Sequence, residues 1–398
     1  MIKSIADVNL QDKTVLCRVD YNVPIENQQI QDDERIVRSL NTINYLLKLN
    51  CKIILCSHLG RPKGIDSNLS LKPIADHLEK LLNQNVTFIE ALSFERIKVS
   101  IDSSTNKVIL LENIRFHEGE TKNNEELSQN LANLAEIFVS DAFGTVHRAH
   151  ASTVGVTRYI PGYAGYLVNE EYEKISKAMY QPDKPVLAII GGSKVSTKID
   201  LIKKFVESVN TIVIGGGMSF TFFKMMGYNV GNSLVEDDML ETAKYIIETA
   251  EKNNVSIILP ADIKLSKTFN EPWLEDGEVK IVSVTDIPDE SMGLDIGPKT
   301  INLILESIRN ANTIFWNGPQ GVFEKELYRT GTVEIAREII NKNTTTIIGG
   351  GDTAYALKYL NQEIPENIHL STGGGATLEL LSGIQLPGIM CLQGKILN

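Results

Sequence analysis

Short runs of apolar, often β-branched residues recur along the chain, and most are followed by a segment whose apolar residues have helical spacing. In the first part this pattern predicts strands at 14–22, 52–57, 86–90, 108–113 and 137–141, and helices at 35–49, 71–82 and 124–136. In the second part it predicts strands at 185–190, 210–215, 256–260, 280–284, 312–318 and 344–350, and helices at 198–209, 242–253, 300–310 and 332–343. Such alternation is typical of parallel sheets with crossover helices, so we expect an α/β fold from end to end.

One segment has the character of a connector between two domains. The apolar residues of 168–180 lie on one helical face, glutamates stand four residues before lysines, and two prolines follow. The pattern predicts a stiff helix at a boundary near 165–185, although an ordinary surface helix has the same pattern.

Length, charge and cysteine usage narrow the class of protein. A chain of 398 residues is long enough for two or three domains. Its 39 basic residues against 50 acidic ones give a net charge of −11, which disfavours nucleic acid as a partner. The four cysteines form no CxxC pair, the first residues lack the apolar core of a secretory signal, and no apolar run is long enough to span a bilayer. We therefore expect a cytoplasmic protein with no membrane partner.

Polar residues follow four predicted strands of the first part, where most of the arginines also lie. They are Asp20, Asn22, His58, Arg61, Arg115 and Arg148. Because the carboxyl ends of parallel strands meet at one edge of a sheet, we expect these side chains to converge. Guanidinium groups bind phosphate and carboxylate bidentately, so the set suits a small phosphorylated carboxylate. Any single arginine after a strand is more often only a solvated loop charge, and the histidines of 147–150 lack the companions of a metal site.

The second part carries glycine clusters instead. They are GGSK (191–194), GGGM (215–218), WNGP (316–319), GGGDT (349–353) and STGGGAT (371–377). Bare backbone N–H groups at the start of a helix attract phosphate, which suits a nucleotide. A lone glycine triplet more often marks a tight turn, but five clusters at comparable positions favour a site. Neither GxxxxGK[ST] nor GxGxxG occurs, which argues against a Walker-type NTPase and a standard dinucleotide fold.

Four charged residues accompany these glycines. Asp352 would be repelled by a polyphosphate unless it helps to hold Mg²⁺, and it can equally cap the helix that follows. Lys194 and Lys198 would share a helical face if GGSKVSTK begins a helix, although surface lysines at this spacing are common. Glu324 has no informative spacing. A small anion bound by one domain and a Mg-nucleotide bound by the other predict phosphoryl transfer in a cleft that closes and excludes water.

Eight motifs together resemble the phosphoglycerate kinase family, in order and over essentially the whole chain. They are RVDYNVP (18–24), SHLGRP (57–62), ENIRF (112–116), SDAFGTVHRAHAST (140–153), GGSKVSTKI, GPQGVFE, GGGDT and STGGGA. The resemblance implies a monomer of two Rossmann-like α/β domains, each a parallel sheet flanked by helices. It implies a phosphoglycerate-binding domain at 1–168, a nucleotide-binding domain at 169–386 with a connector helix at 169–181, and a tail at 387–398 that returns to the first domain.

The resemblance also implies a reaction and a set of site residues. The reaction is reversible phosphoryl transfer from 1,3-bisphosphoglycerate to MgADP, giving 3-phosphoglycerate and MgATP. The substrate residues implied are Asp20, Asn22, Arg35, His58, Arg61, Arg115 and Arg148. The nucleotide residues implied are Lys194, Lys198, Gly215, Glu324, Gly350, Gly351, Asp352 and Thr353, with Asp352 as the Mg²⁺ ligand. The groups implied at the transferring phosphoryl group are Arg35, Lys194, Gly351 and Gly374, with Gly373 as a further N–H donor.

Two other functions remain open at this point. One is a nucleotide-responsive scaffold or regulator that keeps the fold without turnover, against which the intact set of Arg35, Lys194 and Asp352 argues. The other is a nicotinamide dehydrogenase on a similar fold, against which the missing glycine fingerprint argues.

Overall fold

The computed structural model describes residues 2–394, and the chain divides into two units that each have their own sheet and core. One unit comprises the residues up to Glu173 together with those from Gln385, and the other comprises Lys174–Ile384. The division falls within helix α5 (Tyr166–Tyr180), which includes the helix expected at 168–180. After Gln385 the chain forms α13 (Pro387–Leu392), where Gly388 N donates to Val146 O at 2.8 Å. Residues 395–398 of the expected tail lie outside the described residues.

The first unit contains a six-stranded parallel sheet in the order β5-β6-β4-β1-β7-β8. The strands are β1 (Thr14–Val19), β4 (Lys52–Cys56), β5 (Val86–Ile89), β6 (Val108–Leu111), β7 (Ile137–Asp141) and β8 (Gly162–Ala164). All but β8 lie within strands that the apolar pattern predicts. A short β2–β3 hairpin (Ile25–Glu26 and Gln29–Ile30) follows β1.

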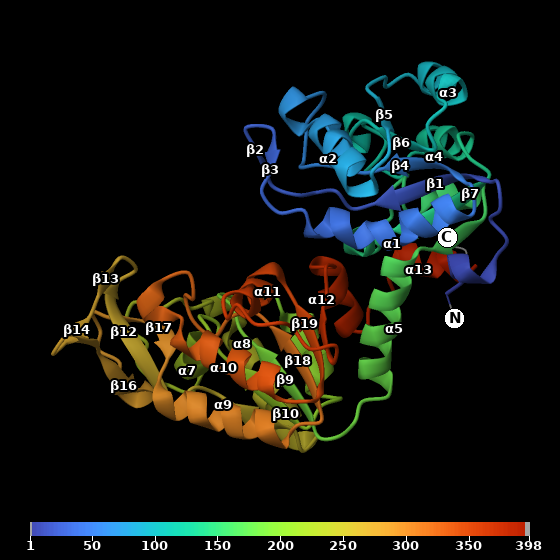
Figure 1. Ribbon diagram of the computed structural model, residues 1–398. Coiled ribbons are helices and arrows are strands. Elements are labelled where there is room, and N and C mark those ends of the chain that lie inside the picture. Colours follow the sequence, from blue (N-terminus) through green and yellow to red (C-terminus); the bar gives the residue numbers. More distant parts are fainter. Residues whose placement is uncertain (1, 395–398) are drawn as a thin grey trace. The chain divides into compact units, whose positions relative to one another are not determined.

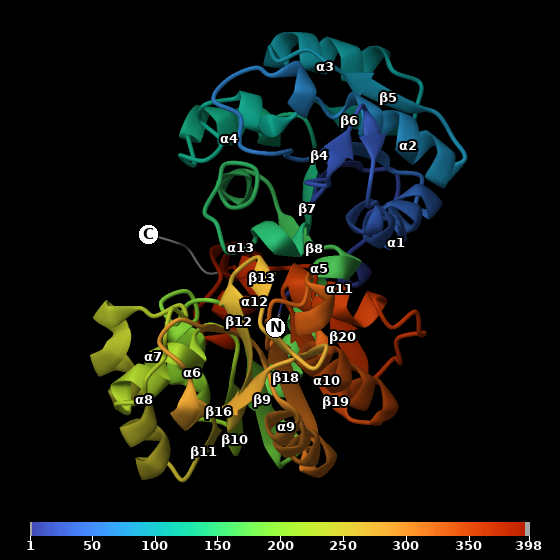
Figure 2. The same cartoon turned by 90° about the vertical axis from the view of Figure 1, so that its left-hand side faces the viewer.

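Successive residues of these strands face two separate cores, because side chains alternate across a sheet. Val15 and Cys17 of β1 pack with α1 (Glu34–Lys48) and α2 (Lys72–Leu82). Leu16, between them, packs with α3 (Phe94–Ser103) and α4 (Glu125–Ala132). Figure 2 shows α4 and α1 on opposite sides of this sheet. Because both faces are covered, the strands are continuous apolar runs.

The second unit repeats this plan with the parallel order β11-β10-β9-β18-β19-β20. Its strands are β9 (Val186–Ile190), β10 (Thr211–Ile214), β11 (Ser256–Ile258), β18 (Thr313–Asn317), β19 (Thr345–Gly349) and β20 (Ile368–Leu370). One face packs against α9 (Pro298–Asn310), α10 (Thr330–Asn341) and α11 (Gly351–Lys358). On the other face, Phe315 of β18 stacks on Phe205 of α6 (Ile199–Phe205) with ring centroids 5.3 Å apart. Further helices are α7 (Ser219–Met225), α8 (Leu240–Lys252) and α12 (Gly375–Leu381).

A second, antiparallel sheet was not expected from the sequence. It consists of β12 (Asp262–Thr268), β13 (Glu271–Pro272), β16 (Ile281–Ser283) and β17 (Met292–Ile296), which are labelled at one end of the second unit in Figure 1. The segment 280–284 therefore contains a strand, as predicted, but the strand pairs antiparallel with β12, so the pattern of parallel strands does not extend from end to end. Antiparallel strands need only hairpin connections, such as the one between β14 (Leu274–Glu275) and β15 (Glu278–Val279). The alternation of strands and crossover helices in the sequence therefore does not indicate them.

The longest helices of the described chain, α1 and α5, have 15 residues each. Within residues 2–394 we find no helix with both the length and the apolarity that crossing a bilayer requires.

Candidate active site

Several of the residues expected to bind substrate are connected by hydrogen bonds around the strand ends of the first unit. Arg35, the second residue of α1, donates to Asp20 Oδ2 at 2.9 Å and to the carbonyl oxygen of Asn22 at 3.3 Å. Asn22 Oδ1 accepts from Gly60 N at 2.9 Å, and Arg115 donates to the carbonyl of Gly60. The loops after β1, β4 and β6 are thus joined at one edge of the sheet, as strand-end geometry predicts.

Positive charge is concentrated around His58, which is 4% exposed. Burial, together with the charges of Arg18, Arg115, Arg148 and Arg35, holds the pKa of His58 well below its usual value. Burial and the neighbouring arginines also lower the pKa of Arg115 to about 10. Arginines that repel one another to this extent favour the binding of an anion among them, because the anion offsets the repulsion.

Arg18 is a member of this cluster that the sequence did not single out. It lies inside β1, is 1% exposed, and donates to Ser152 Oγ at 2.8 Å and to the carbonyl of Val19. Its third guanidinium nitrogen lies 3.2 Å from His58 Nδ1. A charged residue within an otherwise apolar strand was the available signal, since arginine is almost never buried without partners.

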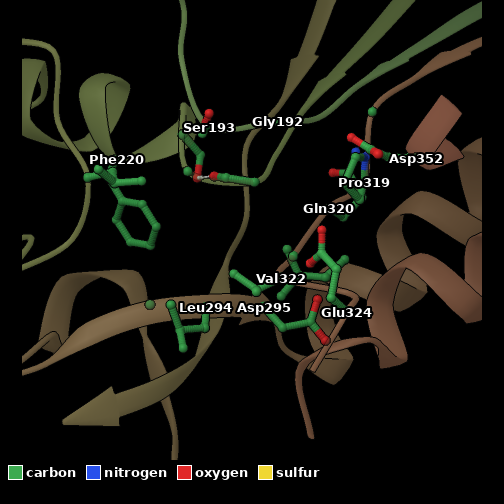
Figure 3. Close-up of a pocket in the computed structure, with 18 of the residues that line it drawn as sticks. Gly192, Ser193, Phe220, Leu294, Asp295, Pro319, Gln320, Val322, Glu324 and Asp352 are labelled. Atoms are coloured by element: carbon green, nitrogen blue, oxygen red, sulfur yellow. Dashed lines mark hydrogen bonds between the residues drawn. The ribbon is translucent and has the colours of Figure 1, made fainter. Parts of the chain in front are cut away.

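The glycine clusters of the second unit line a cavity of about 740 Å³ (Figure 3). Six of the expected nucleotide-binding residues or N–H donors line it: Lys198, Glu324, Gly350, Asp352, Thr353 and Gly374. Lys194, Gly215, Gly351 and Gly373 are not among the lining residues. Gly215 is packed behind the wall, where a Cβ atom would meet Gln320 Oε1 at 1.8 Å.

Two of the loops around this cavity require glycine. Gly216 has φ +68°, and a Cβ there would lie 2.6 Å from the carbonyl oxygen of Gly192, so two loops meet backbone to backbone. Gly350, with φ +95°, precedes the first turn of α11. The loop after β18 is hydrogen-bonded to α11, because Gly318 N donates to Thr353 Oγ1 at 2.7 Å. Backbone N–H groups at the start of α11 are thereby held at the cavity.

Lys198 carries its positive charge in a confined position. Its Nζ donates to the carbonyl oxygens of Gly191 at 2.6 Å and Asn317 at 3.0 Å. Burial lowers the pKa of Lys198 to about 8, and the charge of Asp352 opposes that shift. Helix α6 begins at Ile199, within the helix predicted at 198–209, so GGSKVSTK does not begin a helix and the condition for Lys194 and Lys198 to share a helical face is not met.

The segment before α6, residues 191–198, forms turns and not a helix. Gly192 has φ +123°, and Ser196, from its backbone N, donates to Glu236 Oε2 at 3.0 Å. The Ser196 hydroxyl donates to the same carboxylate. Lys194 is therefore exposed in a loop that Glu236 holds, while Lys198 reaches the cavity.

Comparison with known proteins identifies the family. The family model described as phosphoglycerate kinase matches residues 5–384. The chain is 48% identical over 399 residues to the phosphoglycerate kinase of Thermosipho africanus, with 98% of each chain covered. The chain belongs to the phosphoglycerate kinase family. Among solved structures, phosphoglycerate kinase from Coxiella burnetii has a TM-score of 0.89 at 38% identity, covering 99% of both chains. The enzyme from Pyrococcus horikoshii has a TM-score of 0.84 at 29% identity, covering 98% of both.

The carboxylates at the cavity fit the Mg²⁺ expected from the sequence only if the nucleotide supplies further ligands. Among residues 2–394 there is no group of three His, Cys, Asp or Glu side chains that could hold an ion by themselves. Asp352, exposed in the first turn of α11, is one of three carboxylate residues that line the cavity, together with Glu324 and Asp295. Mg²⁺ is usually bound by one or two carboxylates together with substrate phosphates and water, so this donor set fits a Mg-nucleotide.

Proposed function

We propose that the protein catalyses the reversible transfer of a phosphoryl group from 1,3-bisphosphoglycerate to MgADP, giving 3-phosphoglycerate and MgATP. The observation that carries this proposal is the convergence of arginines from separate segments on one edge of the first sheet, in a chain of the phosphoglycerate kinase family. Such a cluster matches a phosphorylated carboxylate, because guanidinium groups bind both phosphate and carboxylate bidentately.

In this proposal the first unit binds the phosphoglycerate. Arg61, Arg115 and Arg148 bind its phosphate, with His58, Asp20 and Asn22 beside them. Arg35 stabilises the charge that develops on the transferring group. Its ion pair with Asp20, at 2.9 Å, supports this role because it holds the guanidinium in place before the substrate arrives.

The second unit binds the nucleotide. Lys198 and the backbone N–H groups of Gly350, Gly351, Gly373 and Gly374 neutralise its phosphates, Thr353 fastens the loop, and Glu324 accepts from the ribose. Gly215 shapes the wall behind the phosphates, and Lys194 follows the phosphoryl group. Bound by Asp352 and the phosphates, Mg²⁺ supplies neutralisation of the charge on the phosphate oxygens. Because the side chains bind and orient, transfer proceeds directly in line, without a covalent intermediate.

Direct transfer requires the two bound ligands to meet with water excluded. We propose that the domains close about α5 to achieve this, and that the protein acts as a cytoplasmic monomer. Its four cysteines are all free thiols, which is consistent with a reducing compartment.

The test is a coupled assay for ATP formation from MgADP and 1,3-bisphosphoglycerate. We expect turnover, and we expect Arg35→Ala to lower kcat by on the order of 10³ while leaving the Kd for MgADP unchanged. Arg158→Ala, which removes an exposed arginine of the same unit, is the matched control and should keep full activity. A wild-type protein that binds both ligands without turnover would favour the inactive scaffold, and full activity of Arg35→Ala would remove Arg35 from its role.

A further inference from the structure

The buried guanidinium of Arg18 faces the imidazole of His58, and the contact has only one possible direction. Arginine has five N–H donors and no acceptor, so the His58 Nδ1 that lies 3.2 Å from Arg18 must accept. A neutral imidazole that accepts at Nδ1 carries its proton on Nε2. The carboxylate that could compete, Asp20 Oδ1, lies 3.8 Å from Nδ1 and is beyond hydrogen-bond distance.

Arg18 is itself held by a chain of hydrogen bonds that ends on a buried carboxylate. Ser152 Oγ donates to Glu120 Oε1 at 2.6 Å, so it is left to accept from Arg18 Nε at 2.8 Å. Ser152, from its backbone N, also donates to Glu120 Oε2 at 3.0 Å. Glu120 is 1% exposed, and His150 Nδ1 lies 3.6 Å from its Oε1.

The charge balance of this chain requires an ionised Glu120. Burial raises the pKa of Glu120, but the imidazole of His150 at 3.6 Å, the charge of Arg18 and the hydrogen bonds from Ser152 outweigh burial and leave the pKa below its usual value. The buried cation therefore has a buried anion one serine away, as burial of a charge demands. The guanidinium is fixed from behind and presents one N–H to His58.

We propose that Arg18, anchored by Ser152 and Glu120, is a positioning residue that keeps His58 as the neutral tautomer with its proton on Nε2. Within residues 2–394 the hydrogen bond of the His58 ring is made at Nδ1, which leaves the Nε2–H for the ligand. If the proposed function holds, the acceptor is an oxygen of the phosphoglycerate.

The groups that face His58 from the surrounding elements act in the same direction. Arg35 comes from α1, Arg115 from the turn after β6, and Arg148 from the loop after β7, while Asp20 brings a carboxylate to 3.8 Å from Nδ1. Three further positive charges disfavour an imidazolium at this position. A neutral donor adds a hydrogen bond to the anion without adding a fifth positive charge to the four arginines. We therefore expect no protonation of His58 between about pH 7 and 9.

The direct test is ¹⁵N NMR of the imidazole nitrogens in the ligand-free protein, with the His58 signals assigned from His58→Gln. We expect the one-bond proton coupling on Nε2 and none on Nδ1. In the double variant Arg18→Met/Glu120→Gln, which removes both buried charges together, we expect a mixture of tautomers and a raised His58 pKa. Arg158→Met, at an exposed position of the same unit, should leave the signals unchanged.

Kinetics give a second measurement. The double variant should raise KM for 3-phosphoglycerate about tenfold, as expected when a hydrogen bond to a charged group is misdirected, with little change in KM for MgATP. Arg18→Lys, which keeps a donor, should restore the Nε2 tautomer. A proton on Nδ1 in the wild type, or an unchanged tautomer in the double variant, would overturn the proposal. If the double variant does not fold, a proton on Nδ1 in the wild type would still overturn the proposal, and Arg18→Lys then tests the role of the guanidinium. Because the NMR needs no substrate, the expected tautomer in an inactive protein would refute only the proposed function.

Discussion

The confined ammonium of Lys198 predicts that nucleotide binding takes up a proton. An unperturbed lysine has a pKa of about 10.4, whereas burial lowers the pKa of Lys198 to about 8. At pH 8 about half of the ligand-free molecules therefore carry a neutral amine. A phosphate beside Nζ favours the charged form and returns the pKa towards its usual value. We expect an uptake of about half a proton per nucleotide at pH 8 and almost none at pH 6.5.

The same shift has a free-energy cost in the ligand-free protein. The fall in the pKa of Lys198 from about 10.4 to about 8 corresponds to about 3 kcal/mol. The sign follows from proton linkage: between about pH 8 and 10 the unfolded chain binds a proton that the folded chain lacks, so stability rises with pH across this window. Below pH 8 the cost is present in full. Phosphate binding offsets this cost. The affinity for nucleotide therefore depends on the confined position that the carbonyl oxygens of Gly191 and Asn317 give to Lys198 Nζ.

The assay is isothermal titration calorimetry of MgADP in two buffers that differ in ionisation enthalpy, at pH 6.5 and pH 8. The terminal phosphate of the nucleotide is already ionised at pH 8, so it contributes no proton there. Lys198→Arg is the matched control, because its guanidinium is charged throughout and should take up none. If the wild type shows no buffer dependence at pH 8, or if Lys198→Arg takes up as much as the wild type, the reasoning about the buried ammonium is refuted.

Three further predictions concern the second unit. Asp352→Asn should weaken binding of MgADP about tenfold but not of metal-free ADP, since the carboxylate serves the metal; equal losses in calorimetry would contradict the assignment. Gln320 is 1% exposed, and within residues 2–394 neither its Oε1 nor its Nε2 has a hydrogen-bond partner. Gln320→Met should therefore raise the free energy of unfolding by about 1 kcal/mol in urea, and a loss of stability would show that the amide is satisfied. Burial raises the pKa of Asp295 to about 7, so the folded chain holds a proton between about pH 4 and 7 that the unfolded chain has lost, and stability falls as pH rises through this range. Burial raises the pKa of Asp141 to about 7 as well, so Asp295→Asn should reduce that slope in the urea midpoints, and an unchanged slope would exclude Asp295 as a source.

Much of the fold could be predicted because strands buried on both faces leave a continuous apolar signal. Strands β1, β4 and β9 are of this kind, and their predicted ranges contain the observed ones. The antiparallel strands β13, β14 and β15 lack that signal, because each is two residues long and at least partly exposed. Helix α3 was also missed, although it packs on the same core as α4.

The site divides in the same way. Asp20 and Arg115 could be singled out because a polar residue directly after a buried strand must lie at the sheet edge where ligands bind. Lys194 and Lys198 could be identified from the sequence, but their positions relative to each other could not be predicted. The turn between Gly192 and Ile199 depends on the hydrogen bond of Ser196 to Glu236, forty residues further along the chain.

By itself the amino-acid sequence determined the two parallel sheets, the arginine-rich and glycine-rich halves, and the family, because apolar periodicity and motif order are local properties of the chain. Only the tertiary structure decided the ionic state of the groups within those halves. Arg18 and Ser152 are 134 residues apart in sequence yet hydrogen-bonded, and Lys198 is confined by a carbonyl 119 residues away. Desolvation and the direction of a hydrogen bond arise from what folding brings around a group, and no spacing along the chain contains them.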